Sequence, residues 1–133
     1  MATQYSVAAR TSQMSQLNTT IGINAQIIFY SGAVPANVGT AATGTLLVQF
    51  AGNATGFGTA TSGVLTAAAV AGANASAAGV AGYYRINTAA GVAATQGTVT
   101  GSGGGGDMVL TNTNIASAQA CTFTSLTITA SGA

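Results

Sequence analysis

The 133-residue chain is almost without charge: Arg10, Arg85 and Asp107 are its only ionic side chains, and the net charge is +1. This count excludes a basic nucleic-acid surface and a polybasic membrane patch, because both need several Lys or Arg side chains. It also excludes acid–base catalysis and a protein metal site, since the chain has no His, no Glu and a single Asp.

The composition predicts one domain with a thin core. Leu, Ile, Val and Phe make up about a fifth of the chain, and there are 19 Gly. A free soluble domain usually relies on a net charge of magnitude about 2–8. With a net charge of +1, we expect the working state to be assembled, with the neutral surface covered by further copies or by a larger structure.

Residues 2–21 carry the only helical pattern. Thr3 is the expected N-cap, and Gly22 is expected to end the helix. This segment either covers one open end of the β-domain or docks as an arm on a neighbouring subunit, so we divide the chain into an N-terminal helical arm (1–24) and a β-sandwich domain (25–133). The apolar stripe has members three and four residues apart: Val7, Arg10, Met14, Leu17 and Ile21.

The first predicted strands follow the helix. Residues 25–30 (AQIIFY) have bulky side chains on both faces, which is typical of a central, covered strand. Residues 45–50 (TLLVQF) alternate, which predicts Leu46, Val48 and Phe50 inward. A weaker strand is predicted at 63–70, and the segments 31–44 and 51–62 are predicted as long loops.

The next strand is predicted at 79–88. Alternation places Tyr84 and Ile86 on one face and Tyr83 and Arg85 on the other. We expect Arg85 on an exposed outer face, stacking on a ring or pairing with Asp107. Such a surface pair contributes little, about 0–1 kcal/mol.

The segment 91–128 is interpreted as an antiparallel meander that closes the sandwich. It contains a strand at 92–99, a glycine loop at 101–106 and a strand at 107–111 with Met108 and Leu110 inward. In the run CTFTSLTIT, the inward residues break strict alternation by one position, which predicts a β-bulge. Those residues are Phe123, Leu126 and Ile128.

These elements predict a mainly β fold. We expect an antiparallel β-sandwich of seven to eight short strands, of jelly-roll or Greek-key type, with one N-terminal helix. No fixed-length repeat runs through the chain, so a solenoid is not expected. The first residues lack a basic region followed by an apolar core, and no run of about 18 apolar residues occurs, so neither a secretory signal nor a membrane span is expected.

Two sequence features resemble chemical motifs. GSGGGG at 101–106 has the spacing G-x-G-x-x-G, but a dinucleotide site also needs a helix after it and an acidic residue about 20 positions later. We interpret it as a hairpin loop capped by the Asp107 side chain. The lone Cys121 lies in a β-type run and is interpreted as a small buried hydrophobic residue. No cofactor is expected.

The segments MATQYSVAAR, GYYRINT, QGTVT and GGGGDMVLTNTNIASAQACTFTSLTIT resemble a family of small structural proteins of tailed bacteriophages. The resemblance covers the first ten residues and about 80–133. It implies a β-sandwich virion protein, described in that family as capsid decoration (cement) or fibre-like. It implies no catalytic residues.

The resemblance implies a cement protein that binds the outside of an icosahedral phage head, as a dimer or trimer, and stabilises capsomer contacts. Its partners would be the major capsid protein or other virion proteins, and it would bind neither nucleic acid nor membrane. The loops 31–44 and 51–62 and the N-terminal helix are the expected contacts. The interface candidates are Val7, Arg10, Met14, Leu17, Val34, Pro35 and Phe57.

Other functions remain open from the sequence. One is a tail, neck or head-fibre component of the virion. Another is a carbohydrate- or receptor-binding module, although four Tyr, four Phe and no Trp offer few stacking platforms. A flat threonine ladder that binds ice or sugar would need regular Thr-x-Thr repeats, and only TFTSLTIT comes close.

Overall fold

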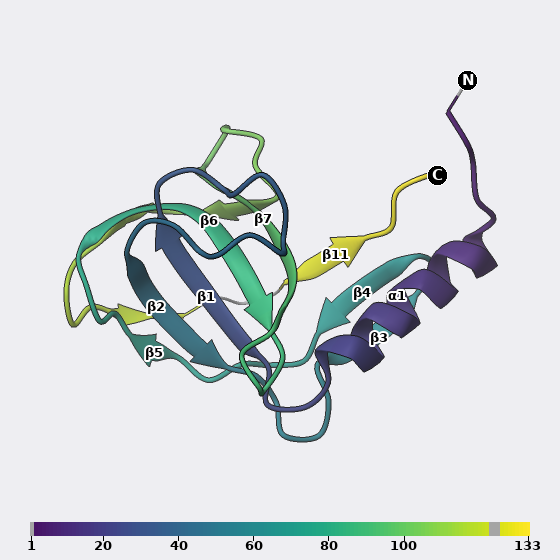
Figure 1. The fold of residues 1–133 in the computed structure, drawn as a ribbon, viewed down its shortest axis with the longest axis horizontal. Coiled ribbons are helices and arrows are strands. Elements are labelled where there is room, and N and C mark those ends of the chain that lie inside the picture. Colours follow the sequence, from purple (N-terminus) through teal and green to yellow (C-terminus); the bar gives the residue numbers. More distant parts are fainter. Residues whose placement is uncertain (1, 123–125) are drawn as a thin grey trace.

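The computed structural model describes residues 2–122 and 126–133, and it confirms a mainly β fold with one N-terminal helix (Figure 1). The arrangement is sandwich-like. The described residues contain more strands than expected because several pairings are only two or three residues long. The elements are α1 (Val7–Ile21), β1 (Gln26–Ser31), β2 (Leu46–Ala51), β3 (Gly58–Thr61), β4 (Val64–Ala67), β5 (Ala73–Asn74), β6 (Gly79–Asn87), β7 (Ala93–Gly101), β8 (Met108–Leu110), β9 (Asn114–Ile115), β10 (Ala120–Cys121) and β11 (Thr127–Thr129).

In the described residues, the strands form one large sheet, one three-stranded sheet and one two-stranded ladder. The main sheet has the order β2-β1-β6-β7-β8, and β9 pairs with β6 beyond this path. The three-stranded sheet, here called the small sheet, has the order β11-β4-β3. Strands β10 and β5 pair in a two-stranded ladder. Every pairing is antiparallel except that of β7 with β8, which is parallel.

The predicted meander over 91–128 is wrong. Its strands are shared among all three sheets, because β8 extends the main sheet, β10 pairs with β5 and β11 pairs with β4. The glycine loop at 101–106 joins parallel strands and is therefore no hairpin. Positive φ angles at Gly103 and Gly105 let so short a segment turn the chain back on itself. The predicted bulge and the predicted inward position of Phe123 fall on 123–125, outside the described residues.

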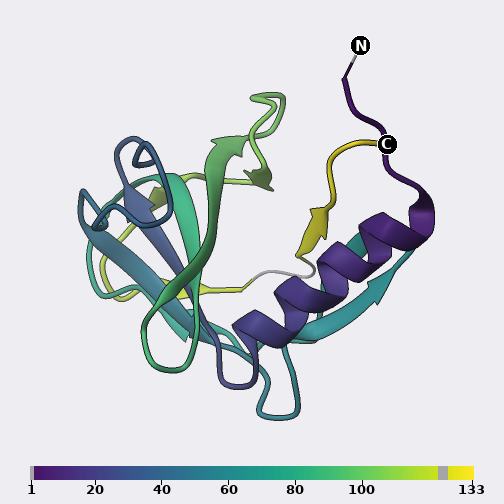
Figure 2. The same cartoon turned by 45° about the vertical axis from the view of Figure 1, so that its right-hand side comes forward.

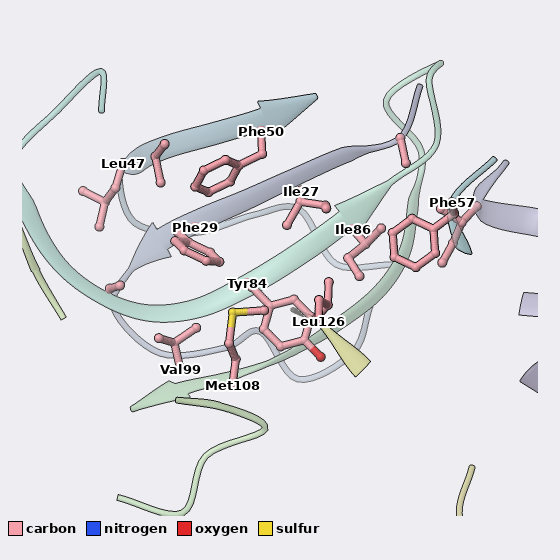
Figure 3. Packing of buried hydrophobic residues seen from close by; sticks show 14 of the residues in the cluster. Ile27, Phe29, Leu47, Phe50, Phe57, Tyr84, Ile86, Val99, Met108 and Leu126 are labelled. Carbon is pink, nitrogen blue, oxygen red and sulfur yellow. The ribbon is translucent and has the colours of Figure 1, made fainter. Parts of the chain in front are cut away.

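The core lies on the inner face of the main sheet (Figure 3). The rings of Phe29 and Phe50 meet edge to face, with centroids 5.5 Å apart. Strand β1 lies between β2 and β6, so its prediction as a central, covered strand is confirmed. The inward side chains of the two central strands include Ile27, Phe29, Tyr84 and Ile86.

The inward pattern of β2 differs from its prediction at one position. Val48 and Phe50 are buried as expected, but Leu47 is fully buried in place of Leu46, which is half-buried. The register explains this, because Phe29 pairs with Val48 and Tyr30 pairs with Leu46, so Leu47 has no opposite residue. This bulge re-aims the Leu47 side chain into the core.

Helix α1 begins later than predicted. The N-cap is Ser6, whose Oγ accepts the Ala9 N–H at 3.2 Å, and the Thr3 prediction is wrong. The preceding residues are extended, and the Tyr5 N–H binds the Gly132 carbonyl at 2.7 Å. The predicted end at Gly22 is confirmed: its φ is +71°, and its N–H bonds the Asn18 carbonyl at 3.0 Å.

Helix α1 is tied to the small sheet through Asn18. Its side-chain Oδ1 accepts the Gly58 N–H at 3.0 Å, and its Nδ2 donates to the Gly58 carbonyl at 2.9 Å. We expect Asn18→Ala to lower the free energy of unfolding by about 2 kcal/mol, because it removes the hydrogen-bond partners of both the N–H and the carbonyl of Gly58. Urea unfolding measures this. Gln16→Ala, at an exposed position of the same helix, should change stability by less than about 0.5 kcal/mol, and equal effects would contradict the role of Asn18.

The outer face of the main sheet is covered by residues 32–45, here called the outer loop (Figure 1). The Tyr83 hydroxyl accepts the Thr43 N–H at 2.9 Å and donates to the Thr43 carbonyl at 2.6 Å. The Gln96 side chain donates to the Pro35 carbonyl at 2.8 Å. Polar side chains of β6 and β7 therefore hold the loop against the sheet.

Candidate interaction surface

The small sheet presents an exposed face made of threonines. Thr66 of β4 lies directly opposite Thr59 of β3 and Thr127 of β11, and this forms a row across all three strands. The next row is Thr61, Val64 and Thr129. Residues in one row, and alternate residues along one strand, share a face of the sheet. The threonine face therefore consists of Thr59, Thr61, Thr66, Thr127 and Thr129, all of them exposed.

The opposite face of the small sheet is covered. Leu65 is fully buried there and belongs to the same hydrophobic cluster as Met14 and Ile21 of α1. Helix α1 lies along β3 and β4 (Figures 1 and 2). The chain thus buries one side of this sheet and leaves a hydroxyl-rich, uncharged side to the solvent.

This face was not predicted from the sequence, because β3 lies in a segment predicted as loop. The available signal was the run TATSGVLT, in which alternating threonines flank a two-residue turn. Ser62 and Gly63 both have positive φ, +51° and +79°. That combination is typical of a tight hairpin turn whose twist matches the flanking strands.

The seven interface candidates do not form one surface. Val7 is 52% exposed at the start of α1, whereas Met14 and Phe57 are buried in the core cluster. The side chains of Met14 and Phe57 therefore contact the chain's own residues. Whether the others meet a partner stays a prediction. The remaining four, Arg10, Leu17, Val34 and Pro35, are half-buried.

Arg85 lies on the predicted outer face, but the predictions that it is exposed and that it pairs with Asp107 are wrong. The side chain is only 5% exposed, and it binds neutral partners instead of Asp107. Its Nε donates to Gln96 Oε1 at 3.0 Å, and its Nη2 donates to the Thr40 carbonyl at 2.5 Å. The reason is the outer loop, which covers a face that alternation alone marks as solvent-exposed.

The predicted cap of the glycine loop by the Asp107 side chain is wrong in its partner, because the side chain binds Thr98 of β7. Its Oδ2 accepts the Thr98 N–H at 2.8 Å and the Thr98 hydroxyl at 2.9 Å, and its own N–H donates to the Thr98 Oγ1 at 3.1 Å. These hydrogen bonds favour the ionised carboxylate, and they lower the pKa of Asp107 below its ordinary value.

The lowered pKa predicts a loss of stability in acid. The stabilisation from Asp107 is fully present above the unfolded-state pKa, which is about 3.9, and it is lost as the pH falls through the lower folded-state pKa. An NMR titration of the Asp107 carboxyl carbon measures the folded-state pKa on which this prediction depends. Thr98→Val should raise the Asp107 pKa toward the ordinary value, and an ordinary pKa in the unmodified chain would contradict the prediction.

Cys121 differs from the prediction of a buried hydrophobic residue, because it is only half-buried at the margin of the core cluster. Its thiol contacts the Gln119 carbonyl, with an S···O distance of 3.5 Å. Desolvation raises the pKa of the thiol. Less thiolate is therefore present at neutral pH than for a free cysteine, which makes this a poor nucleophile.

The described residues contain no group of three or more His, Cys, Asp or Glu side chains placed to hold a metal ion. In the same residues, no helix combines the length and the hydropathy needed to cross a bilayer. No protein-family model, curated protein or solved structure matches the chain.

Proposed function

We propose that the chain is a virion structural protein, a decoration protein that binds the outside of a phage head and stabilises contacts between capsomers. The observation that carries this proposal is the threonine face, an ordered and uncharged surface with no covering element among the described residues. The near absence of charge and the sequence resemblance to phage structural proteins also support it.

The physics of such attachment follows from the surface. Threonine methyl groups supply apolar area, while each hydroxyl both donates and accepts a hydrogen bond. Strand β11 is the last strand of the small sheet among the described residues, and an edge strand can pair with a strand of a partner. Weak contacts of this kind, repeated over a shell, sum through multivalency. With three ionic side chains in the chain, attachment should depend only weakly on salt.

Immunogold electron microscopy of virus particles from the source of the chain tests the proposal. We expect many copies over the head shell, retained when NaCl is raised from about 0.1 to about 1 M. Label confined to the tail, neck or fibres would favour another virion component. Particles without label, or label released by moderate NaCl, would contradict the proposal.

A charge placed in the centre of the threonine face tests the surface itself. We expect Thr66→Lys to reduce co-sedimentation with particles at least tenfold, a loss of about 1.4 kcal/mol, because a buried ammonium group would have no acidic partner on this sheet. Thr111→Lys, at an exposed position after β8, is the matched control and should bind normally. Equal binding by both variants would place the contact elsewhere on the chain.

The threonine face also favours a second candidate, a surface for hydroxyl-bearing ligands such as carbohydrate or ice. Its hydroxyls repeat at about 4.8 Å across strands and about 6.8 Å along them, the spacings of a regular sheet. A glycan array and an ice-recrystallisation assay test this candidate. Activity in either assay that is lost in Thr66→Lys, together with unlabelled particles, would replace the decoration proposal.

A further inference from the structure

A cavity of about 370 Å³ lies between the outer loop and the outer face of the main sheet. Its floor is formed by Tyr30 of β1 and by Arg85 and Asn87 of β6, and its walls by residues 38–42 and 91–93. None of these residues belongs to the threonine face, so the cavity is a separate feature of the molecule.

Arg85 brings an unpaired positive charge to this cavity. The guanidinium has five N–H donors, and within the described part of the chain two of them have partners, the Gln96 side chain and the Thr40 carbonyl. The one acidic side chain of the chain, Asp107, is bonded to Thr98. A buried charge is costly unless an opposite charge or further hydrogen bonds compensate it, so Arg85 remains only partly compensated within the described residues.

Asn87 lines the same cavity and carries an unpaired acceptor. Its Oδ1 is buried and has no hydrogen-bond partner among the described residues. Arg85 and Asn87 are alternate residues of β6, so they share a face and lie about 6.8 Å apart along the strand. The cavity floor thus holds a cationic side chain and, two residues along the same strand, a side chain whose carbonyl oxygen still lacks a donor.

These two features define the complementary ligand. A carboxylate matches the planar fork of one guanidinium and neutralises its single charge. A phosphate dianion would need further cations, and the only other one in the chain, Arg10, lies on α1 and does not line the cavity. The Asn87 acceptor then calls for a hydroxyl or N–H group next to the carboxylate.

We propose that this cavity binds a carboxylate that carries a neighbouring hydroxyl or amide N–H donor, held by Arg85 and Asn87. Two sources supply such a group: a small hydroxy acid, or an Asp or Glu side chain with the backbone N–H of another protein. The proposal does not depend on the proposed function, because a free acid can fill the cavity without any assembly.

Titration of the full-length ¹⁵N-labelled chain, followed by NMR, tests the proposal. The probes are glycolate, acetate, the neutral amide glycolamide, and N-acetyl-aspartate N-methylamide as the peptide source. We expect saturable shifts of the Arg85 Nε–H and of the amides of 38–42 and 91–93. Glycolate should bind about fivefold more tightly than acetate, and glycolamide should leave these signals unchanged. Tighter binding of the aspartate derivative than of glycolate would identify the protein source, and the reverse order the small acid.

Variants separate binding from folding. Arg85→Gln should weaken glycolate binding at least tenfold, while Arg10→Gln, on the far element, should bind as the unmodified chain does. Asn87→Ala should lower the affinity for glycolate to that for acetate and leave acetate binding unchanged. If Arg85→Gln does not fold, Asn87→Ala and the four probes still decide the matter. The absence of saturable shifts up to about 50 mM glycolate would overturn the proposal. Equal shifts with glycolamide would overturn it as well.

Discussion

A single methyl group at position 82 is expected to disrupt the main sheet. Gly82 lies in β6, and a Cβ atom there would collide with the backbone carbonyl oxygen of Gly32, at the start of the outer loop. Backbone cannot move aside as the end of a flexible side chain can, so β1 and β6 would have to separate beside the register shift at Tyr30 and Ser31. We expect Gly82→Ala to lower the free energy of unfolding by about 3 kcal/mol.

Urea unfolding followed by circular dichroism measures the effect of Gly82→Ala. The matched control is Gly101→Ala at the end of β7, where a Cβ would meet nothing within 4 Å. Because Gly101 has no positive φ, the control should change stability by less than about 1 kcal/mol. Two variants of equal stability would show that the Gly32 carbonyl does not approach β6 as closely as the structure has it.

Loss of the Tyr83 hydroxyl is expected to release the outer loop. This hydroxyl satisfies both the N–H and the carbonyl of Thr43, at 2.9 and 2.6 Å. Tyr83→Phe leaves the ring in place but removes a donor and an acceptor from a fully buried site. We expect a loss of about 2 kcal/mol and faster amide hydrogen exchange across 33–44, with little change in β2 or β7.

The neighbouring Tyr30 supplies the control for Tyr83→Phe. The two rings stack with centroids 5.0 Å apart and planes 12° from parallel. Tyr30 is only half-buried, and its hydroxyl has no hydrogen bond among the described residues. Tyr30→Phe should therefore change the free energy of unfolding by less than about 0.5 kcal/mol. Equally fast exchange in the outer loop of Tyr30→Phe would show that the loss of either hydroxyl releases the loop, which would contradict a specific role for the Tyr83 hydrogen bonds.

Short-range sequence patterns correctly predicted the features that short-range interactions produce. The helix end at Gly22 follows from a residue that adopts positive φ without strain. The covered position of β1 follows from bulky side chains on both its faces, since a strand with water on one side normally alternates.

Signals that depend on distant residues misled the prediction. Alternation assigns Arg85 to the face opposite Ile86, which is correct, but it cannot say that the outer loop later covers that face. Leu47 points inward because β2 has one residue more than β1 across their pairing, and the sequence of β2 alone contains no sign of its partner's register.

The sequence by itself determined that this protein has almost no ionic chemistry to offer, that it is mainly β, and that one helix precedes its strands. These properties follow from residue counts and short-range periodicity, which need no partner strand. Only the tertiary structure decided which strands pair. It brings Thr59, Thr66 and Thr127 from separate segments into one exposed row, and it encloses Arg85 beneath a loop that begins more than 50 residues earlier. Both sites depend on long-range pairing, whose register is set by complementary packing between segments and not by either segment alone.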